Sequence, residues 1–314
     1  MDDKQKTPVP ADRYSEEQLL AFTGYDYYDF IASRGERLRP RMARALALAN
    51  IKPGLRVLDI GCGRGEMAFH AVERGARVVG IDYSADCLSL TKRTLRFTSQ
   101  GILASAALVG ADATALPFGD ASFDRVLMLD IIEHLHPWQL DLALREVVRV
   151  LSKGGYLIAH TLPNRWALRY GYRLLRLLTP TLPPDPRADY EPEVHVNEQD
   201  IVRLKRSLNR AGFASRVWLE NLTVDQALWQ GKGRRFADIR QHVYPLLRRP
   251  LPRAIISLLM HTPLKLVAAN DIYAIAWHPG GPAPPVLESK PFLDLLEKVT
   301  IEVQGLVRKE NGSY

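Results

Sequence analysis

The sequence predicts an α/β protein with a doubly wound, mostly parallel sheet of seven strands and an added helical cap. Short β-branched, apolar segments alternate with helical segments between residues 56 and 160, as βαβ units do. These apolar segments have few polar interruptions, which is typical of parallel strands that helices cover on both faces. The first of them runs directly into a glycine-rich loop.

The segments before the sheet predict a tail followed by two helices. Residues 1–14 are polar and are expected to form a loose tail. The residues from Ser15 to Gln18 have the spacing of a capping box, so a helix is expected to begin there. A second helix is predicted at residues 37–50, ending before Lys52-Pro53-Gly54.

The alternation then predicts five strands, at 56–60, 77–81, 107–109, 123–129 and 156–160, separated by helices at 66–73, 85–97 and 139–151. Beyond residue 161 we expect a helix at 164–178, a Pro-rich loop at 179–196 and a helix at 198–211 that is stopped by Gly212. Two further strands are predicted at 216–220 and 272–277. About fifty mostly helical residues separate the last two strands. A linker at 279–286 and a helix at 288–308 are predicted to end the chain.

Composition limits the class of protein and its setting. The 314 residues are 46% hydrophobic and 25% charged, which excludes disordered, collagen-like and coiled-coil chains. Cys62 and Cys87 are too few for a disulfide framework and fit a reducing compartment. Met1 to Lys4 are unlike a secretory signal, and no run of about 18 apolar residues could span a bilayer. We therefore expect a cytoplasmic protein, free in solution or peripheral at a membrane surface.

Glycines and carboxylates mark the candidate ligand site. Gly61, Gly63 and Gly65 follow the first strand, where glycine lets the backbone turn sharply and approach a ligand. A dinucleotide site would place a glycine at position 66, which is Glu66, so a purely structural strand–helix turn remains an alternative. Arg64 is expected to point outward, so no phosphate cradle is predicted.

Two aspartates follow the next strands. Asp82 ends the second strand, 21 residues after Gly61, and can accept hydrogen bonds from both hydroxyls of a ribose, or cap the helix that begins at Ala85. Asp112 follows the third strand and can accept from the exocyclic amine of adenine, or be a surface turn residue.

Over residues 50–165 the sequence resembles a class I S-adenosylmethionine-dependent methyltransferase, of the methyltransferase-11-like and ubiquinone-pathway-like kind. The resemblance is carried, in order, by Leu58-Asp59-Ile60-Gly61-Cys62-Gly63-Arg64-Gly65, Gly80-Ile81-Asp82-Tyr83-Ser84, Asp112-Ala113-Thr114-Ala115-Leu116-Pro117-Phe118, Phe123-Asp124, Ile132-Glu133-His134-Leu135 and Leu151-Ser152-Lys153-Gly154-Gly155. It implies a Rossmann-like methyltransferase fold and S-adenosylmethionine as cofactor, with S-adenosylhomocysteine as product. The cofactor-binding residues that it implies are Asp59, Gly61, Cys62, Gly63, Gly65, Asp82, Tyr83, Asp112, Ala113 and Asp130.

The candidate catalytic residues are Asp130, Glu133 and His134, which would share one face of a helical turn. Methyl transfer needs mainly alignment, and a base such as His134 only for a poorly acidic acceptor. Some related O-methyltransferases of ubiquinone and small RNA carry a Glu-x-x-Glu-His that holds a divalent metal. Asp130 replaces the first Glu here, so no metal is predicted, although His136 and His160 could add ligands.

The acceptor is expected to be a small or lipid-linked molecule that is methylated on oxygen, with nitrogen and carbon as less favoured alternatives. Nucleic acid is less favoured, because the segment after the fourth strand, Leu129 to Ile132, lacks the Asn/Asp-Pro-Pro-Tyr/Phe typical of base methylation. An RNA methyltransferase and a cofactor-binding scaffold without turnover remain alternatives. The oligomeric state does not follow from the sequence.

Positive charge is concentrated after the cofactor motifs. Residues 165–255 contain 17 Lys and Arg against 9 Asp and Glu, a net of +8, while the whole chain carries +7. Arg165, Arg169, Arg173 and Arg176 form one helical stripe, which could line a lid or lie on an anionic membrane. The expected organisation is an N-terminal segment over the site at 1–50, a core at 51–221 and 270–278, cap segments at 164–197 and 222–269, and a linker with a last helix at 279–314.

Overall fold

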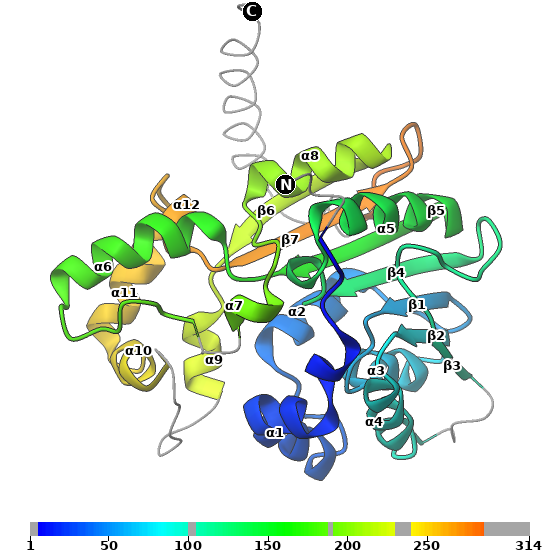
Figure 1. Ribbon diagram of the computed structural model, residues 1–314, viewed down its shortest axis with the longest axis horizontal. Coiled ribbons are helices and arrows are strands. Elements are labelled where there is room, and N and C mark those ends of the chain that lie inside the picture. Colours follow the sequence, from blue (N-terminus) through cyan, green and yellow to red (C-terminus); the bar gives the residue numbers. More distant parts are fainter. Residues whose placement is uncertain (1–5, 100–104, 188–190, 230–239, 286–314) are drawn as a thin grey trace, which may run out of the picture.

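The computed structural model describes residues 6–99, 105–187, 191–229 and 240–285, and its centre is a seven-stranded sheet (Figure 1). The strands are β1 Arg56–Ile60, β2 Arg77–Asp82, β3 Ala106–Gly110, β4 Phe123–Leu129, β5 Leu151–Thr161, β6 Ala214–Glu220 and β7 Asp271–Trp277. The predicted number of strands is confirmed, and each predicted strand overlaps an observed one.

The strand order is β3-β2-β1-β4-β5-β7-β6. The five strands from β3 to β5 pair in parallel, and β7 lies antiparallel between β5 and β6. The sequence therefore fills one half of the sheet from β1 to β3 and then crosses to the other side of β1 at β4. This reversal opens a crevice at the carboxyl ends of β1 and β4, where ligands bind in open α/β sheets.

Helices cover both faces of the sheet. Buried side chains of α2 Pro40–Ala49 and α3 Glu66–Glu73 pack in one apolar cluster with β1, β2 and β5. Side chains of α5 Pro137–Val150 and α8 Ile201–Ala211 pack in a second cluster with β1, β4 and β7. Figure 1 shows α3 and α4 Ala85–Leu95 below the sheet and α5 with α8 above it. The predicted doubly wound α/β fold is confirmed.

The amino-terminal segment differs from its prediction, because residues 6–14 are not a loose tail. They include a 3-10 turn at Ala11–Tyr14, and Val9 is buried. The indole of Trp138 donates to the carbonyl of Lys6 at 3.3 Å, so backbone contacts attach this segment to α5. The helix α1 Glu16–Ala32 then begins as predicted, with the Ser15 hydroxyl accepting from the Gln18 amide.

The predicted helix at 164–178 is also corrected. A π-helical segment at Ala167–Gly171 precedes α6 Tyr172–Leu178, so the chain does not form one regular α-helix there. Gly171 in this segment lies against α12 Lys265–Ala268, so closely that a Cβ on Gly171 would overlap the carbonyl oxygen of Val267. This packing replaces the regular helical period that the sequence pattern predicts.

The remaining helices form the cap beside the sheet. They are α7 Glu191–Val194, α9 Thr223–Trp229, α10 Arg240–Leu247 and α11 Pro250–Leu259. The short α7 lies inside the segment that was expected to be a loop. The helix predicted at 288–308 lies outside the described residues. No helix in the described ranges is long and apolar enough to cross a membrane.

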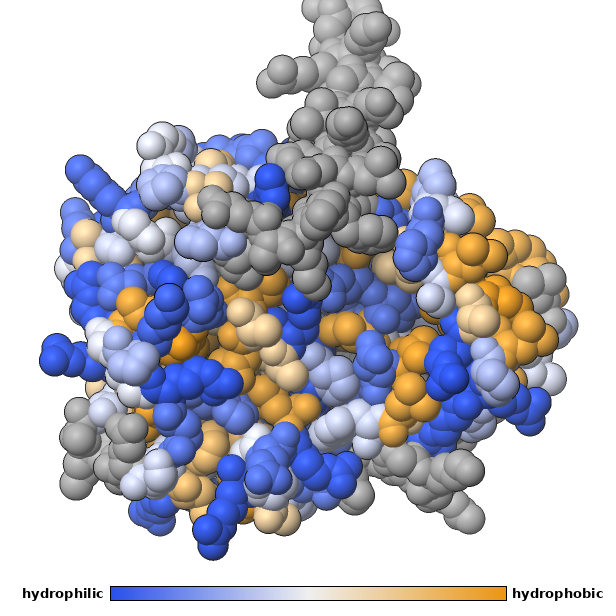
Figure 2. Space-filling view, turned by 180° about the vertical axis from the view of Figure 1, so that it is seen from behind, coloured by the Kyte–Doolittle hydropathy of each residue, from blue (hydrophilic) through white to orange (hydrophobic). Residues whose placement is uncertain are grey.

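The cap carries exposed apolar side chains together with arginines. In α6, Leu174 and Leu177 are exposed, and in α11 the same is true of Leu251, Ile255 and Leu258. Figure 2 shows apolar side chains gathered at the right-hand edge of the molecule, where the turned view places the cap. The predicted arginine stripe contributes to this surface, with Arg169, Arg173 and Arg176 exposed in the same segment.

Candidate active site

A pocket of about 460 Å³ lies at the carboxyl ends of β1, β2 and β4. Its walls come from four parts of the chain: the amino-terminal segment, the start of α2, the loops after the strands and the segment that contains α7. The predicted residues that line it are Asp59, Gly61, Cys62, Gly63, Asp82, Tyr83, Asp112, Ala113, Asp130, Glu133 and His134. Gly65 does not line the pocket and instead precedes α3 as its N-cap.

The glycine loop has a backbone that other residues would strain. Gly61 has a φ of +70°, and a Cβ there would lie 2.7 Å from the Cδ1 atom of Ile131. Gly65 has a φ of +83°, and a Cβ there would lie 2.8 Å from the Cα atom of Thr91. The two positions therefore require glycine for both conformation and space.

Asp82 links this loop to the end of β2. One carboxylate oxygen accepts from the Gly63 amide at 3.1 Å, and the other accepts from the Ser84 amide at 2.9 Å. The side chain that caps α4 is that of Ser84, whose hydroxyl accepts from the Cys87 amide, so Asp82 is not the cap. Each oxygen of Asp82 has a lone pair left for a ligand hydroxyl.

The other acidic residues differ in burial. Asp59 is buried, and burial together with the charges of Glu66 and Asp82 raises its pKa to about 7. Asp112 is exposed and accepts from the Thr114 amide at 2.8 Å, so it is a turn residue that also faces the pocket. Asp59 can therefore change its charge near neutral pH, at the end of the pocket formed by the glycine loop.

Three arginines line the pocket near the glycine loop, and two of them were not anticipated from the sequence. Arg39 and Arg41 come from the start of α2, and the ε-nitrogen of Arg41 donates to Asp130 at 2.7 Å. Arg64 was expected to point outward, but its side chain is only 5% exposed and donates to Glu66 at 2.5 Å. The sequence offered little sign of Arg39 and Arg41 as site residues. Nothing in Arg39-Pro40-Arg41 at the start of a helix indicates contact with the glycine loop, which lies about twenty residues later.

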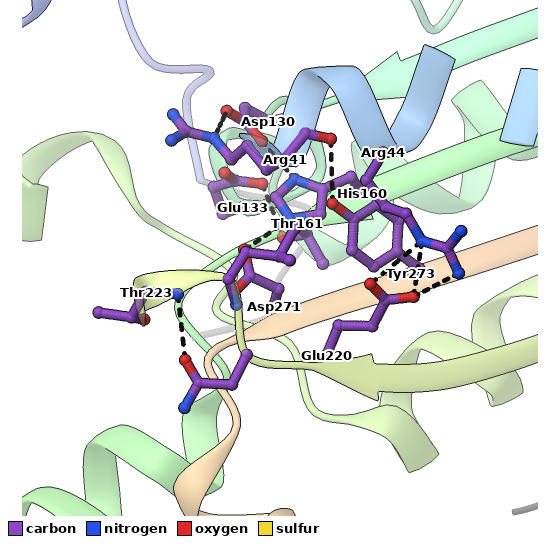
Figure 3. A network of polar contacts seen from close by, with 12 residues as sticks. Arg41, Arg44, Asp130, Glu133, His160, Thr161, Glu220, Thr223, Asp271 and Tyr273 are labelled. Atoms are coloured by element: carbon purple, nitrogen blue, oxygen red, sulfur yellow. Dashed lines mark hydrogen bonds and ion pairs between the residues drawn. The ribbon is translucent and has the colours of Figure 1, made fainter. Parts of the chain in front are cut away.

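Asp130 is the centre of a polar network at the end of β4 (Figure 3). Its backbone is left-handed, with a φ of +54°, and its carboxylate lies between Arg41 and His160, with 2.5 Å to the Nδ1 atom of His160. The other ring nitrogen of His160 lies 3.2 Å from Asp271 on β7. The buried network thus joins α2, β4, β5 and β7 beneath the pocket.

The charges in this network stabilise one another. Burial opposes ionisation of Asp130, but Arg41 and His160 hold the pKa of this carboxyl well below its usual range. Burial likewise opposes protonation of His160, yet Asp130 and Asp271 raise its pKa to about 9. At neutral pH the network therefore contains a protonated histidine between two carboxylates.

Glu133 and His134 lie in a 3-10 turn, Ile132–His134, and do not share a helical face with Asp130. That prediction was wrong because the left-handed backbone of Asp130 turns its side chain toward His160. Glu133 accepts from the Thr161 hydroxyl at 2.7 Å, and burial with the nearby charge of Asp130 raises its pKa to about 8. Burial lowers the pKa of His134 to about 4, so its ring is neutral at neutral pH.

His134 is held by groups on both sides of the pocket. Its Nδ1 atom lies 2.9 Å from the Tyr14 hydroxyl and 3.1 Å from the carbonyl of Val194. His195, which the sequence reasoning did not single out as a site residue, packs edge-on against it with ring centroids 4.8 Å apart. Ligand atoms of Glu133, His134 and His195 lie within 4.8 Å of one another, which makes these three the candidate metal ligands of the described chain.

The two histidines considered as extra metal ligands do not belong to this group. The Nε2 atom of His136 lies 3.0 Å from the carbonyl of Thr7, and His160 is held between Asp130 and Asp271. That interpretation was therefore wrong for both residues.

The segment from β1 to β5 is similar to known methyltransferases. A family model described as a methyltransferase domain matches residues 58–159. A demethylmenaquinone methyltransferase of Beutenbergia cavernae is 32% identical over 207 residues, which cover 63% of this chain and 81% of that protein. One of Thermus thermophilus is 36% identical over 141 residues, covering 44% of this chain and 61% of that protein.

A fatty-acid O-methyltransferase of Mycolicibacterium smegmatis is 37% identical over 107 residues, covering 33% of this chain and 36% of that protein. Among solved structures, a Haemonchus contortus phosphoethanolamine N-methyltransferase 2 in complex with S-adenosyl-L-methionine has a TM-score of 0.55 at 20% identity, over 85% of this chain and 58% of that chain. This likeness shows the fold alone. Together with the identity over four-fifths of the Beutenbergia cavernae protein, the family model shows that the chain belongs to the class I S-adenosylmethionine-dependent methyltransferases.

Proposed function

We propose that this protein transfers the methyl group of S-adenosylmethionine to an oxygen atom of a small-molecule or lipid-linked acceptor. The observation that carries the proposal is the convergence of carboxylates from the ends of four parallel strands on one pocket, namely Asp59, Asp82, Asp112 and Asp130. The cofactor is cationic at its sulfonium and ammonium groups, so a pocket with these carboxylates suits it. The family to which the chain belongs supports the same cofactor.

In this proposal the end of each strand binds a different part of the cofactor. Asp82 accepts from the ribose hydroxyls through its two free lone pairs, with Tyr83 beside the adenine. Asp112 accepts from the adenine amine, and Ala113 offers its amide. The glycine loop faces the methionyl part, Asp59 meets the ammonium group, and Asp130 supports that end through its contact with Arg41.

When bound, the cofactor supplies an activated methyl group, and the chain's residues orient the acceptor and receive its proton. His134 is neutral, lines the pocket and is held by Tyr14 and Val194, so it is the candidate base for an acceptor hydroxyl. Glu133 fixes the turn that carries His134 through its hydrogen bond with Thr161. Alignment of the acceptor oxygen with the methyl group supplies most of the remaining rate enhancement.

A metal ion is not part of the proposal, although Glu133, His134 and His195 could hold one. Turnover that survives dialysis against a chelator supports His134 as a base. Turnover that is lost on chelation and regained with a divalent ion would make these residues metal ligands instead.

The cap is proposed to select the acceptor and to contact a membrane peripherally. Residues 164–197 and 222–269 present exposed leucines beside Arg169, Arg173 and Arg253, which form no ion pairs within the described part of the chain. Such a surface suits an anionic lipid layer at the cytoplasmic face. The fatty-acid O-methyltransferase relative supports a lipid-like acceptor with an oxygen nucleophile, whereas the demethylmenaquinone relatives leave a quinone acceptor as the next candidate.

Two measurements, each across a salt series, distinguish a membrane partner from an RNA partner. They are co-sedimentation with phosphatidylserine liposomes and retention of RNA. We expect Arg173→Glu to weaken liposome binding and Arg96→Glu, an exposed charge reversal at the C-cap of α4, to leave it unchanged. RNA retention that falls steeply with salt in the absence of any liposome binding would favour the RNA methyltransferase alternative.

Calorimetric titration with S-adenosylhomocysteine tests the cofactor site itself. We expect Asp82→Ala to abolish measurable binding and Asp120→Ala, which removes an exposed carboxylate outside the pocket, to bind like the wild type. Binding that Asp82→Ala leaves intact contradicts the proposed site. Binding without methyl transfer to any acceptor screened would favour the scaffold alternative.

A further inference from the structure

The helix α11 is mostly apolar, yet none of its residues is buried. Among its ten residues Arg253 alone is charged. Leu251, Ile255 and Leu258 are 70%, 50% and 68% exposed, and their spacing of four and three residues places them on one face of the helix. The described chain therefore leaves this apolar face uncovered, and a contiguous apolar surface of this kind marks an interaction site.

The neighbouring part of the cap adds to this surface. In α6, Leu174 and Leu177 are 58% and 78% exposed and lie about one helical turn apart. The helix α12 contacts both α11 and the π-helical segment that leads into α6, so the two exposed rows belong to one packed unit. Figure 2 shows apolar side chains gathered at the edge where this unit lies. We call the five exposed side chains of α6 and α11 the cap face: Leu174, Leu177, Leu251, Ile255 and Leu258.

The chain around the cap face is positively charged and carries no acid. Residues 164–184 and 240–270 contain nine Lys and Arg residues and no Asp or Glu. Arg173 on α6, Arg253 on α11 and Arg249 directly before α11 are exposed. A surface that combines leucines with cations alone fits a partner with an apolar interior and an anionic exterior.

This pattern distinguishes three kinds of partner. A second copy related by a two-fold axis would set the cap face against itself, and arginines would meet arginines without a carboxylate to balance them. RNA would neutralise the arginines but leave the leucines in water. An anionic bilayer accommodates both, because its acyl chains receive the leucines and its phosphates pair with the arginines. At ten residues α11 is about 15 Å long, half the thickness of the hydrocarbon core, so it would lie along the surface.

We propose that the cap face inserts into the acyl layer of an anionic membrane, with α11 lying in the plane of the interface. The inference rests on the proposed function for the membrane contact of the cap. It adds the five side chains that enter the acyl layer and assigns the lasting part of the binding to their burial rather than to charge pairing. Binding that is held by apolar burial persists at salt concentrations that screen surface charges.

Co-sedimentation of the full chain with vesicles of phosphatidylserine and phosphatidylcholine, at about 0.1 M and about 0.5 M salt, tests the insertion. We expect the wild type to stay bound at the higher salt concentration. Leu258→Glu should bind about 10- to 100-fold more weakly at both concentrations, because it removes an inserted leucine and places a charge in the acyl layer. Leu142→Glu is the matched control, since Leu142 is a 40% exposed leucine on α5, outside the cap, and it should bind like the wild type.

A fluorescent label reports insertion directly. An environment-sensitive nitrobenzoxadiazole group attached to Ile255→Cys should brighten and shift to the blue on these vesicles. The same group on Leu142→Cys should do neither. Cys62 and Cys87 are buried, so the introduced thiol is the accessible one in each variant.

Titration of every variant with S-adenosylhomocysteine checks its fold and keeps the cofactor site separate from the cap. Wild-type vesicle binding that disappears at the higher salt concentration, or Leu258→Glu that binds as tightly as the wild type, overturns the insertion while methyl transfer stands. A wild type that ignores vesicles but forms a dimer that Leu258→Glu dissociates would assign the cap face to a second copy instead. If S-adenosylhomocysteine fails to bind the wild type, the proposed methyl transfer fails, and the vesicle measurements still decide the insertion.

Discussion

His160 is a fully buried side chain whose charge depends on two carboxylates from other strands. Asp130 and Asp271 hold its two ring nitrogens, and no part of its ring reaches solvent. Removing one of these three residues leaves the charges of the other two buried without full compensation. Such a change strongly destabilises a protein with a buried ion pair. The network therefore fixes the end of β4, and with it the left-handed Asp130, below the ligand pocket.

The raised pKa of His160 predicts a loss of stability at alkaline pH. A histidine whose pKa rises from 6.5 to about 9 on folding contributes stability that is fully present below pH 6.5 and is lost as the pH rises through 9. The size of the shift corresponds to about 3 kcal/mol. Urea denaturation from pH 6 to pH 9.5 should therefore show this decline in the wild type and not in His160→Gln.

The control for this measurement is His278→Gln, since that ring is part-buried beside the carbonyl of Leu151, 2.9 Å away, at the opposite end of β5 from His160. Asp59 and Glu133 also titrate near this range, and the charge of His160 itself lowers the pKa of Glu133, so the difference between the curves reports His160 together with its effect on Glu133. An identical alkaline decline in wild type and His160→Gln would show that His160 is not charged in the folded state.

Gly61 predicts a second effect at the residue scale. Gly61→Ala places a methyl group 2.7 Å from Ile131 at a φ of +70°, so we expect it to cost about 1–3 kcal/mol of stability and to weaken cofactor binding. Gly154→Ala is the matched control, because a Cβ there meets nothing within 4 Å. Denaturation and titration on both variants check this, and equal behaviour would contradict the steric argument.

At the scale of elements, the sequence was most informative where the pattern is local. The bounds predicted for β1, α3 and β4 agree with the structure, because glycines or a change of hydrophobic period delimit each of them. The expected tail at residues 6–14 was wrong because backbone contacts with α5 order it, and no sequence period records such contacts.

The π-helical segment before α6 was missed for a related reason. A regular helix fits the pattern of residues 164–178, but the contact between Gly171 and Val267 joins segments that lie almost a hundred residues apart. Local propensity carries no information on that contact. The insertion between β6 and β7 therefore packs against the first helical segment of the cap.

This contact predicts that Gly171→Ala destabilises the cap. The added Cβ would lie 1.9 Å from the Val267 carbonyl, so either α12 or the π-helical segment must move, at a cost of about 1–3 kcal/mol. Urea denaturation measures the loss. Gly119→Ala should be close to neutral, since its nearest neighbour is the Ser122 hydroxyl at 3.6 Å. A wild-type stability for Gly171→Ala would mean that the π-helical segment does not pack against α12 as described.

At the scale of the whole molecule, the doubly wound, mostly parallel sheet could be predicted but the full lining of the pocket could not. Asp59, Asp82 and Asp130 lie at or just after the carboxyl ends of strands, so the topology alone brings them to one edge. Arg39, Tyr14 and His195 come from segments outside the sheet, and only the packing of those segments brings them to the same place. The strand-end carboxylates were therefore readable from sequence, whereas the cationic part of the site was not.

Because the pocket joins segments from residue 8 to residue 195, ligand binding should stabilise the whole chain. A ligand that binds only the folded state, at 100 times its Kd, adds about 2.7 kcal/mol to the free energy of unfolding. We therefore expect urea denaturation with excess S-adenosylhomocysteine to shift by this amount in wild type and in Asp120→Ala. Asp82→Ala at the same ligand concentration should gain far less. An equal gain in Asp82→Ala would mean that the ligand binds elsewhere on the protein, because the pocket would then have lost its ribose contact without consequence.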